Sequence, residues 1–317
     1  MTSPVPGAAA VAAVQSAARQ RATAESQRVQ ANPEYVLVLS CEDRPGIVAG
    51  ITAMLFEHGG NIEESQQFDD ARSGLFFMRI RFSDPSGADP QQQVSVWRER
   101  TAPLARKFDM TWELWVATNP FRTLIMVSKA GHCLNDLLFR WQSGALNMTI
   151  PAIVSNHTDL EPLARAYGIP FHHIPITPET KDQAEAQLMD LVHEHKVHLV
   201  VLARYMQVLS DQLCQEMSGR IINIHHSFLP SFKGGRPYHQ AFERGVKLVG
   251  ATAHYVTADL DEGPIIEQDV TRVDHRMGPN DLVRAGQDVE ADVLSRAVQW
   301  HCDSRVLLNT DRTVVFD

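Results

Sequence analysis

The sequence predicts an α/β protein of two consecutive domains, a ferredoxin-like βαββαβ unit followed by a Rossmann-like unit with a mainly parallel sheet. Three observations lead to this prediction. About 85 residues near the N-terminus alternate strand and helix patterns in the order βαββαβ. From residue 121 onward, apolar strands alternate with amphipathic helices, the pattern of βαβ units. The chain of 317 residues is also long for a single hydrophobic core.

The composition is that of an ordinary globular protein, with 44% hydrophobic and 21% charged residues. Residues 1–33 are rich in Ala, Gln, Ser and Arg and lack the basic leader and apolar length of a signal peptide. We expect a flexible N-terminal tail over 1–33, a first domain over 34–117 and a second, catalytic domain over 118–317.

Charge, apolar runs and cysteine content limit the partners and the cellular setting that we expect. The formal net charge of -9 disfavours broad contact with nucleic acid, which needs a clustered basic surface. No apolar run approaches the roughly 18 residues that span a bilayer, so we expect no membrane partner. The 4 cysteines lack disulfide-like or CxxC spacing, which indicates reduced thiols in a cytoplasmic protein.

The first domain is predicted element by element. Apolar alternation gives a strand before the turn Asp43-Arg44-Pro45-Gly46, and Gly59-Gly60 ends the helix that follows. The expected strands are 35–41, 61–68, 74–82 and 110–116, and the expected helices are 47–58 and 90–107.

In the second domain the strand 121–127 is continuously apolar, as expected where both faces are buried. Further strands are expected at 150–155, 171–176, 198–203, 221–225 and 248–256, helices at 132–141, 160–167, 181–195 and 278–305, and a hairpin at 306–316. We take residues 284–290 of the last helix to be polar enough to meet a neighbour. The first strand-to-helix turn, Ser128 to His132, has neither GxGxxG nor GxxxxGK[ST], so no nucleotide cofactor is expected.

The stretch from Arg220 to Asp269 carries the candidate chemistry. One apolar strand ends in Asn223, His225 and His226, and the next is followed by the carboxylate of Asp261. In open α/β sheets ligands bind beyond the carboxyl ends of strands, where we place the active site. An amide can stabilise an oxyanion and an imidazole can transfer protons at neutral pH. Without an obvious Ser or Cys nucleophile, this set suggests direct attack on a carbonyl.

A metal is not expected. The segments His172-His173 and His193-Glu194-His195 lack the spacing of metal sites, and adjacent helical residues point in different directions.

The segments Asp43-Arg44-Pro45-Gly46-Ile47-Val48 and Gly60-Asn61-Ile62 resemble the ACT domain, a ligand-sensing module. This resemblance implies a homo-oligomer and an amino-acid effector, with glycine and methionine as candidates, at a site that includes Asp43, Arg44, Pro45, Gly46 and Asn61. The alternative is that the domain serves only as a dimerisation platform.

The second domain resembles the folate-dependent formyltransferase family. The resemblance rests on Asn223-Ile224-His225, Ser227 to Pro230, Gly250 to His254 and Asp261-Glu262-Gly263-Pro264. It implies Asn223, His225 and Asp261 as the catalytic set and 10-formyltetrahydrofolate as substrate, with no cofactor. Substrate-binding or supporting roles are implied or expected for Arg204, Tyr205, Met206, Val208, Leu209, His226, Gly235 and His254.

With both domains present, the chain from about Tyr35 resembles the formyltetrahydrofolate deformylase family. Transferases that formylate a ribonucleotide carry a phosphate loop where this chain has Ser128 to His132, and proline usually follows their histidine, where this chain has His226. We therefore expect hydrolysis to tetrahydrofolate and formate, which balances one-carbon pools and supplies formate for purine biosynthesis. Transfer to a small amine, with Ser128 to His132 holding the acceptor, and a non-enzymatic folate or amino-acid sensor are the alternatives.

Overall fold

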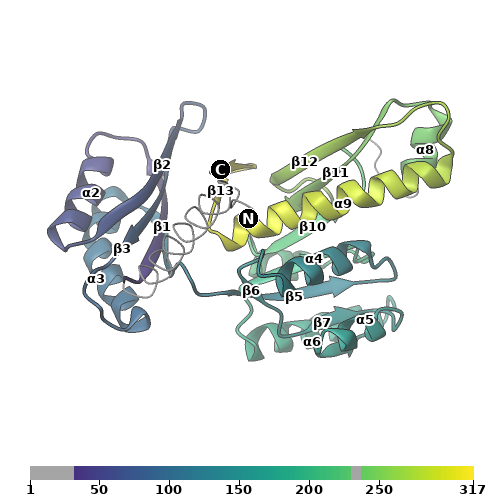
Figure 1. Cartoon of the computed structure of the whole chain (residues 1–317), viewed down its shortest axis with the longest axis horizontal. Helices are drawn as coiled ribbons and strands as arrows, with labels where there is room; N and C mark the ends of the chain where they lie inside the picture. Colours follow the sequence, from purple (N-terminus) through teal and green to yellow (C-terminus); the bar gives the residue numbers. More distant parts are fainter. Residues whose placement is uncertain (1–31, 230–236) are drawn as a thin grey trace, which may run out of the picture. The chain divides into compact units, whose positions relative to one another are not determined.

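The computed structural model describes residues 32–229 and 237–317. The chain divides into two compact units between Thr118 and Asn119 (Figure 1), and each unit is described by itself.

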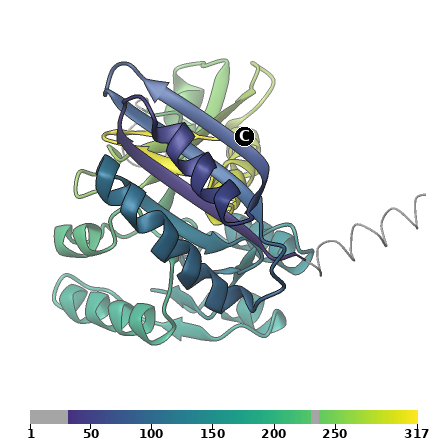
Figure 2. The same ribbon diagram turned by 90° about the vertical axis from the view of Figure 1, so that its left-hand side faces the viewer.

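The first unit is a four-stranded antiparallel sheet with two helices, in the βαββαβ order expected from the sequence. Its elements are β1 (Glu34–Glu42), α2 (Ile47–Glu57), β2 (Asn61–Asp70), β3 (Leu75–Ser83), α3 (Pro90–Phe108) and β4 (Thr111–Val116). The strand order is β2-β3-β1-β4. Helices α2 and α3 lie side by side against this sheet (Figure 2).

Alternation along β1 builds the core of this unit. Tyr35, Leu37 and Leu39 are buried together with Ile51 and Leu55 of α2, as expected for a strand with one face on a helical layer. Helix α2 begins after a glycine with φ 97°, which fits the left-handed conformation glycine adopts at little cost.

The second unit is a Rossmann-like α/β domain. Its sheet contains β5 (Phe121–Val127), β6 (Met148–Thr149), β7 (Ile153–Ser155), β8 (Phe171–His173), β9 (Leu199–Leu202), β10 (Ile221–His225), β11 (Leu248–Tyr255) and β12 (Ile265–Arg272). The helices are α4 (His132–Gln142), α5 (Glu161–Ala166), α6 (Lys181–Glu194), α7 (Asp211–Glu216), α8 (Pro237–Glu243) and α9 (Pro279–Cys302). The described chain ends in the hairpin β13 (Val306–Asn309) and β14 (Arg312–Val315).

The sheet order is β12-β11-β10-β9-β5-β7-β8, with β6 paired to β5. Strands β5 to β10 are parallel, whereas β11 and β12 are antiparallel to their neighbours. The predicted fold class is therefore confirmed. The sequence did not predict α7, α8 or β12, because the two helices are shorter than two turns and β12 is polar after its first two residues.

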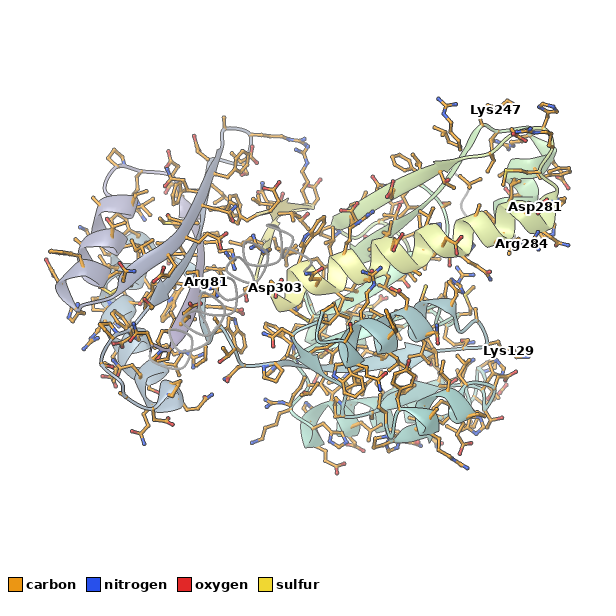
Figure 3. All side chains as sticks on the ribbon, in the orientation of Figure 1. Arg81, Lys129, Lys247, Asp281, Arg284 and Asp303 are labelled. Carbon is orange, nitrogen blue, oxygen red and sulfur yellow. The ribbon has the colours of Figure 1, made fainter. Side chains whose placement is uncertain are left out.

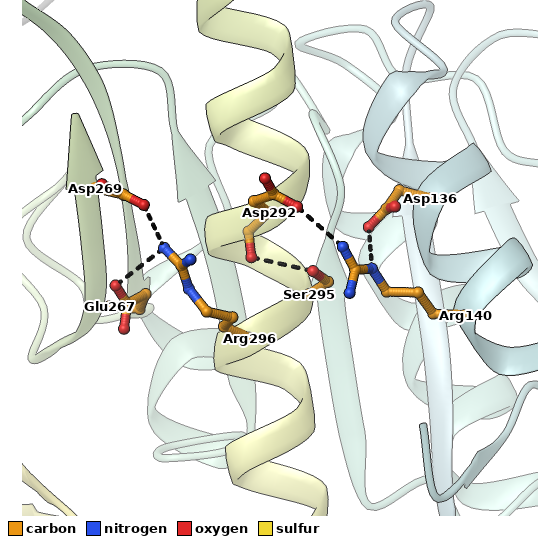
Figure 4. A network of polar contacts seen from close by, with 7 residues as sticks. All are labelled: Asp136, Arg140, Glu267, Asp269, Asp292, Ser295 and Arg296. Atoms are coloured by element: carbon orange, nitrogen blue, oxygen red, sulfur yellow. Dashed lines mark hydrogen bonds and ion pairs between the residues drawn. The ribbon is translucent and has the colours of Figure 1, made fainter. Parts of the chain in front are cut away.

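Helix α9 packs between the antiparallel strands and α4. Figure 3 shows Asp281 and Arg284 at its first turns, where Asp281 Oδ2 accepts a 2.8 Å hydrogen bond from the Gly278 amide. Farther along, Arg296 lies 2.7 Å from Asp269 of β12, and Asp292 lies 2.9 Å from Arg140 of α4 (Figure 4). None of the described helices combines the length and apolarity needed to cross a bilayer.

Candidate active site

The end of β10 brings two candidate residues onto one face of the sheet. Asn223 and His225 are two positions apart on this extended strand, so their side chains project to the same side. Asn223 lies level with Leu202, where the neighbouring strand β9 ends. Both side chains line a pocket of about 240 Å³, whose other walls include residues 204–209 and 256–261.

Asp261 reaches this pocket by a different route from the one expected. Strand β11 runs antiparallel to β10 and places His254 opposite Asn223. The loop from β11 back to β12 then returns Asp261 to the pocket, with its Oδ1 3.2 Å from His225 Nδ1. The expectation that two neighbouring strands both end at this edge was wrong, because the sequence pattern does not reveal strand direction.

The backbone around Asp261 is specialised for this position. Asp261 has φ 57°, a left-handed conformation that aspartate and asparagine tolerate better than most residues. Two residues later, a Cβ on Gly263 would lie 1.8 Å from the Tyr255 carbonyl oxygen. The loop that holds Asp261 therefore requires glycine at position 263.

We expect Gly263→Ala to move this loop and to lower kcat for the protein's reaction by about tenfold or more, since small misplacements of reacting groups are costly. Kinetics and urea unfolding of the variant test this. Gly278→Ala, where φ is -83° and the added carbon would meet only Asp281 Oδ2 at 3.6 Å, controls for loss of a glycine as such. Normal kcat in Gly263→Ala would contradict the account of the loop.

His254 connects the candidate residues. Its Nε2 lies 3.3 Å from Asn223 Nδ2 and 3.7 Å from Asp261 Oδ1, while its Nδ1 donates to the Tyr255 carbonyl at 2.9 Å. With the proton on Nδ1, the neutral ring accepts a hydrogen bond from the Asn223 amide at Nε2. The supporting role expected for His254 stays a prediction, and its contact with Asn223 is shorter than its contact with Asp261.

One ring nitrogen of His225 is bonded to a carboxylate, and the other is open to a substrate. A carboxylate only accepts, so His225 Nδ1 donates to Asp261. His225 Nε2 is buried and has no hydrogen-bond partner among the described residues. The hydrogen bond from His225, and then the neighbouring His254 ring, hold the pKa of Asp261 well below its ordinary value, although burial opposes this. Asp261 is therefore ionised at neutral pH.

The segment expected to bind folate also lines the pocket. Tyr205 and Leu209 are buried, while Met206 and Val208 present exposed apolar side chains. The Met206 amide donates to Ser128 Oγ at 3.0 Å, and Ser128 Oγ donates to Asn156 at 2.7 Å. The first strand-to-helix turn thus supports the backbone of this segment.

Arg204 and His226 join the site to a buried cluster that the sequence did not predict. Arg204 contacts His226 Nδ1, and its Nε lies 3.3 Å from Oε2 of Glu290 on α9. Glu290 is 1% exposed and meets His132, Tyr238 and Arg204 of its own unit. Its spacing could have indicated this, because Leu282, Gly286 and Glu290 recur every four residues on the buried face of α9.

One group among the described residues has the geometry to hold a metal. Ligand atoms of His132, Cys133 and Glu290 lie within 4.8 Å of one another. The nearby Arg204 guanidinium repels a cation, and burial and the Glu290 charge raise the pKa of the Cys133 thiol, which disfavours the ligating thiolate. The chemistry of this group therefore does not favour a metal.

The candidate effector residues do not gather at one place within the chain. Residues 43–46 follow the end of β1 that pairs with Leu75, whereas Asn61 pairs with Ser83, level with Glu34 at the opposite end. At about 3.3 Å per residue, the length of β1 separates them by roughly 26 Å. Asn61 instead donates to Glu63 at 2.7 Å.

Gly235, expected to support the site, lies outside the described residues. Helix α8 begins at Pro237, and Tyr238 on this helix is buried.

Comparison with known families gives two matches, arranged as the two units are. Residues 35–91 match the ACT domain, and residues 121–298 match the formyl transferase family. A formyltetrahydrofolate deformylase of Corynebacterium sp. (strain P-1) is 53% identical over 281 residues, covering 89% of this chain and 97% of that protein. One of Bacillus subtilis (strain 168) is 47% identical over 282 residues, covering 89% and 93%.

Comparison with solved structures gives matches of the same two kinds. A formyltetrahydrofolate deformylase from Burkholderia mallei is 50% identical with a TM-score of 0.86, covering 90% of this chain and 100% of that one. A glycinamide ribonucleotide transformylase from Symbiobacterium toebii is 30% identical with a TM-score of 0.59, covering 65% of this chain and 98% of that one. The likeness to the deformylase extends over both units.

Proposed function

The chain belongs to the formyltetrahydrofolate deformylase family, and we propose that it hydrolyses 10-formyltetrahydrofolate to tetrahydrofolate and formate with Asn223, His225 and Asp261 as the catalytic set. The observation that carries this proposal is the meeting of an amide, an imidazole and an ionised carboxylate in one pocket beside the segment 204–209. The first alternative, transfer to a small amine, uses the same three groups and differs only in the nucleophile.

The three side chains divide the reaction between them. Both histidine contacts of Asp261 use Oδ1, so Oδ2 is the oxygen that can hold a water against the formyl carbon. As the water attacks, it passes a proton to Asp261 Oδ2, while Asn223 and the protonated Nε2 of His225 stabilise the oxyanion of the tetrahedral intermediate. His225 or a water then gives a proton to the leaving folate nitrogen as the C–N bond breaks to release formate, and the proton on Asp261 replaces the one given up.

The hydrogen bonds made by the turn from Ser128 to His132 favour water as the nucleophile. An acceptor with a phosphate group would need free donors there. Ser128 Oγ already bonds Asn156 and Met206, and His132 Nε2 lies 2.8 Å from Glu290. The side chains at both ends of the turn are thus engaged within the protein, which supports hydrolysis over transfer to an acceptor that carries a phosphate group.

The proposal is tested by product analysis with and without an added amine. Purified protein with 10-formyltetrahydrofolate should release formate and tetrahydrofolate in equal amounts, and millimolar glycinamide or hydroxylamine should neither raise the rate nor become formylated. A strict requirement for amine, with a formylated amine as product, would support the transferase. Folate binding without turnover would support the sensor.

The first unit extends the proposal to regulation. The exposed turn at residues 43–46 leads into the N-terminus of α2, which has no side-chain cap, so its amide groups can meet the carboxylate of a free amino acid. Glycine or methionine should therefore bind the full-length protein in calorimetry, and Gly46→Ala should weaken this binding. No heat of binding from either amino acid would contradict an effector site there.

The cellular setting and assembly are proposed on two further observations. The 4 cysteines are buried and unpaired, as in proteins of a reducing cytoplasm, where the released formate can enter purine biosynthesis. Strand β2 is an edge strand of 10 residues with exposed backbone, which a second copy can cover in a homo-oligomer.

A further inference from the structure

The buried carboxylate of Glu290 is the centre of a polar cluster that the catalytic steps above do not use. It lies 2.8 Å from His132 Nε2, accepts a 2.5 Å hydrogen bond from the Tyr238 hydroxyl, and lies 3.3 Å from Arg204 Nε. Burial favours its neutral form, but the hydrogen bond to His132, the Arg204 charge and the Tyr238 hydrogen bond hold its pKa below the ordinary value. Glu290 is therefore a buried anion at neutral pH, stabilised by Arg204 and two hydrogen bonds.

The fold makes specific room for this cluster. A Cβ on Gly286, one turn before Glu290, would lie 2.1 Å from Tyr238 Cζ. The glycine thus allows the tyrosine ring to cross α9 and reach the carboxylate. The cluster continues through Arg204 to His226, whose ring centroid lies 6.3 Å from that of Tyr238.

The contact between Arg204 and His226 defines the protonation of the histidine. A guanidinium group donates hydrogen bonds and cannot accept them. His226 Nδ1 therefore accepts from Arg204, so the ring is neutral with its proton on Nε2. Burial, then the charges of Arg204 and His225, lower the pKa of His226 to about 4, while Glu290 and Asp261 act in the opposite sense.

His226 is also in direct contact with the catalytic set. Its ring stacks on that of His225, with centroids 5.1 Å apart and planes 14° apart. A charged His226 would oppose the imidazolium form of His225 that acts in the proposed reaction. A neutral His226 removes this repulsion and covers one face of the catalytic ring.

We propose that Glu290 is a positioning residue: by holding Arg204 it fixes His226 as the neutral, Nε2-protonated tautomer stacked on His225. The proposed effect of Glu290 on catalysis rests on the proposed deformylase reaction. The proposed tautomer of His226 does not depend on that reaction. The charges that act on the His226 ring are those of Arg204, His225, Glu290 and Asp261. The Tyr238 ring also faces it, with centroids 6.3 Å apart.

The test is ¹⁵N NMR of the full-length protein labelled at histidine, with the His226 signals identified by their loss in His226→Asn. Between pH 5 and 8, His226 should give the pattern of a neutral ring protonated at Nε2. In Glu290→Gln a mixture of tautomers should appear, kcat for formate release should fall about tenfold or more, and KM should change little. Asp288→Asn is the matched control, because it makes the same acid-to-amide change at an exposed position of α9.

The readouts separate the possible failures. Titration of His226 near pH 6.5, protonation at Nδ1, or an unchanged tautomer in Glu290→Gln would each overturn the proposal. If Glu290→Gln does not fold, Arg204→Met removes the donor to His226, and a single Nε2-protonated form in that variant would also overturn it. The NMR measurement needs no substrate. It therefore tests the His226 tautomer even if the protein shows no deformylase activity.

Discussion

Replacing Asp261 with asparagine is expected to lower kcat for formate release by about two orders of magnitude or more. Asparagine tolerates the left-handed backbone at this position and keeps the side-chain shape, so the change removes mainly the negative charge. Without that charge, the water loses its acceptor and the His225 imidazolium loses its stabilising partner at 3.2 Å. Steady-state formate release at saturating substrate measures the effect.

The pH dependence sharpens this expectation. The pKa of Asp261 is held well below its ordinary value, so its carboxylate stays ionised as the pH falls from 8 to 5. Any loss of activity in that range must therefore come from another group. Glu262→Gln is the control, an acid-to-amide change at the next, exposed residue of the loop. Near-normal turnover in Asp261→Asn would show that Asp261 has no catalytic role.

Asn223→Ala is expected to reduce kcat by about 10²- to 10³-fold, the usual effect of removing one oxyanion donor. The amide hydrogen bond strengthens as charge develops on the formyl oxygen, so kcat should fall much more than KM rises. In the native protein, His254 Nε2 lies 3.3 Å from the Asn223 amide nitrogen. The same variant removes this partner from His254.

Two further variants interpret that result. Asn135→Ala, at an exposed position of α4, makes the same substitution away from the pocket and should leave kcat unchanged. His254→Ala should lower kcat by less than Asn223→Ala, because His254 acts through Asn223 and Asp261. If Asn223→Ala raised KM and left kcat unchanged, Asn223 would bind substrate without stabilising the transition state.

The parts of the fold that the sequence predicted are those whose signal is local. Period-two alternation in β1 and the long apolar pattern of β5 define strands by themselves. Strand direction is not local, since it depends on which partner a strand finds across the sheet. The antiparallel course of β11, and with it the approach of His254 to Asn223, therefore had to come from the structure.

The site was predictable to the extent that its residues lie close together in sequence or in a recognised motif. Asn223 and His225 share one face of one strand, so their convergence follows from strand geometry. Glu290 lies 64 positions after His226 and looks in the sequence like one polar residue of a charged helix. Its four-residue spacing from Gly286 indicates the buried face of α9, but only packing shows that its partners are Arg204, Tyr238 and His132.

The central claim is that water is the nucleophile at a formyl group held by Asn223, His225 and Asp261. Turnover of 10-formyltetrahydrofolate in H₂¹⁸O, with the formate examined by mass spectrometry, tests it most directly. One of the two oxygens of each formate should carry ¹⁸O, with an equal amount of tetrahydrofolate and no amine present. Release of unlabelled formate, or turnover only when an amine is added and becomes formylated, would contradict it.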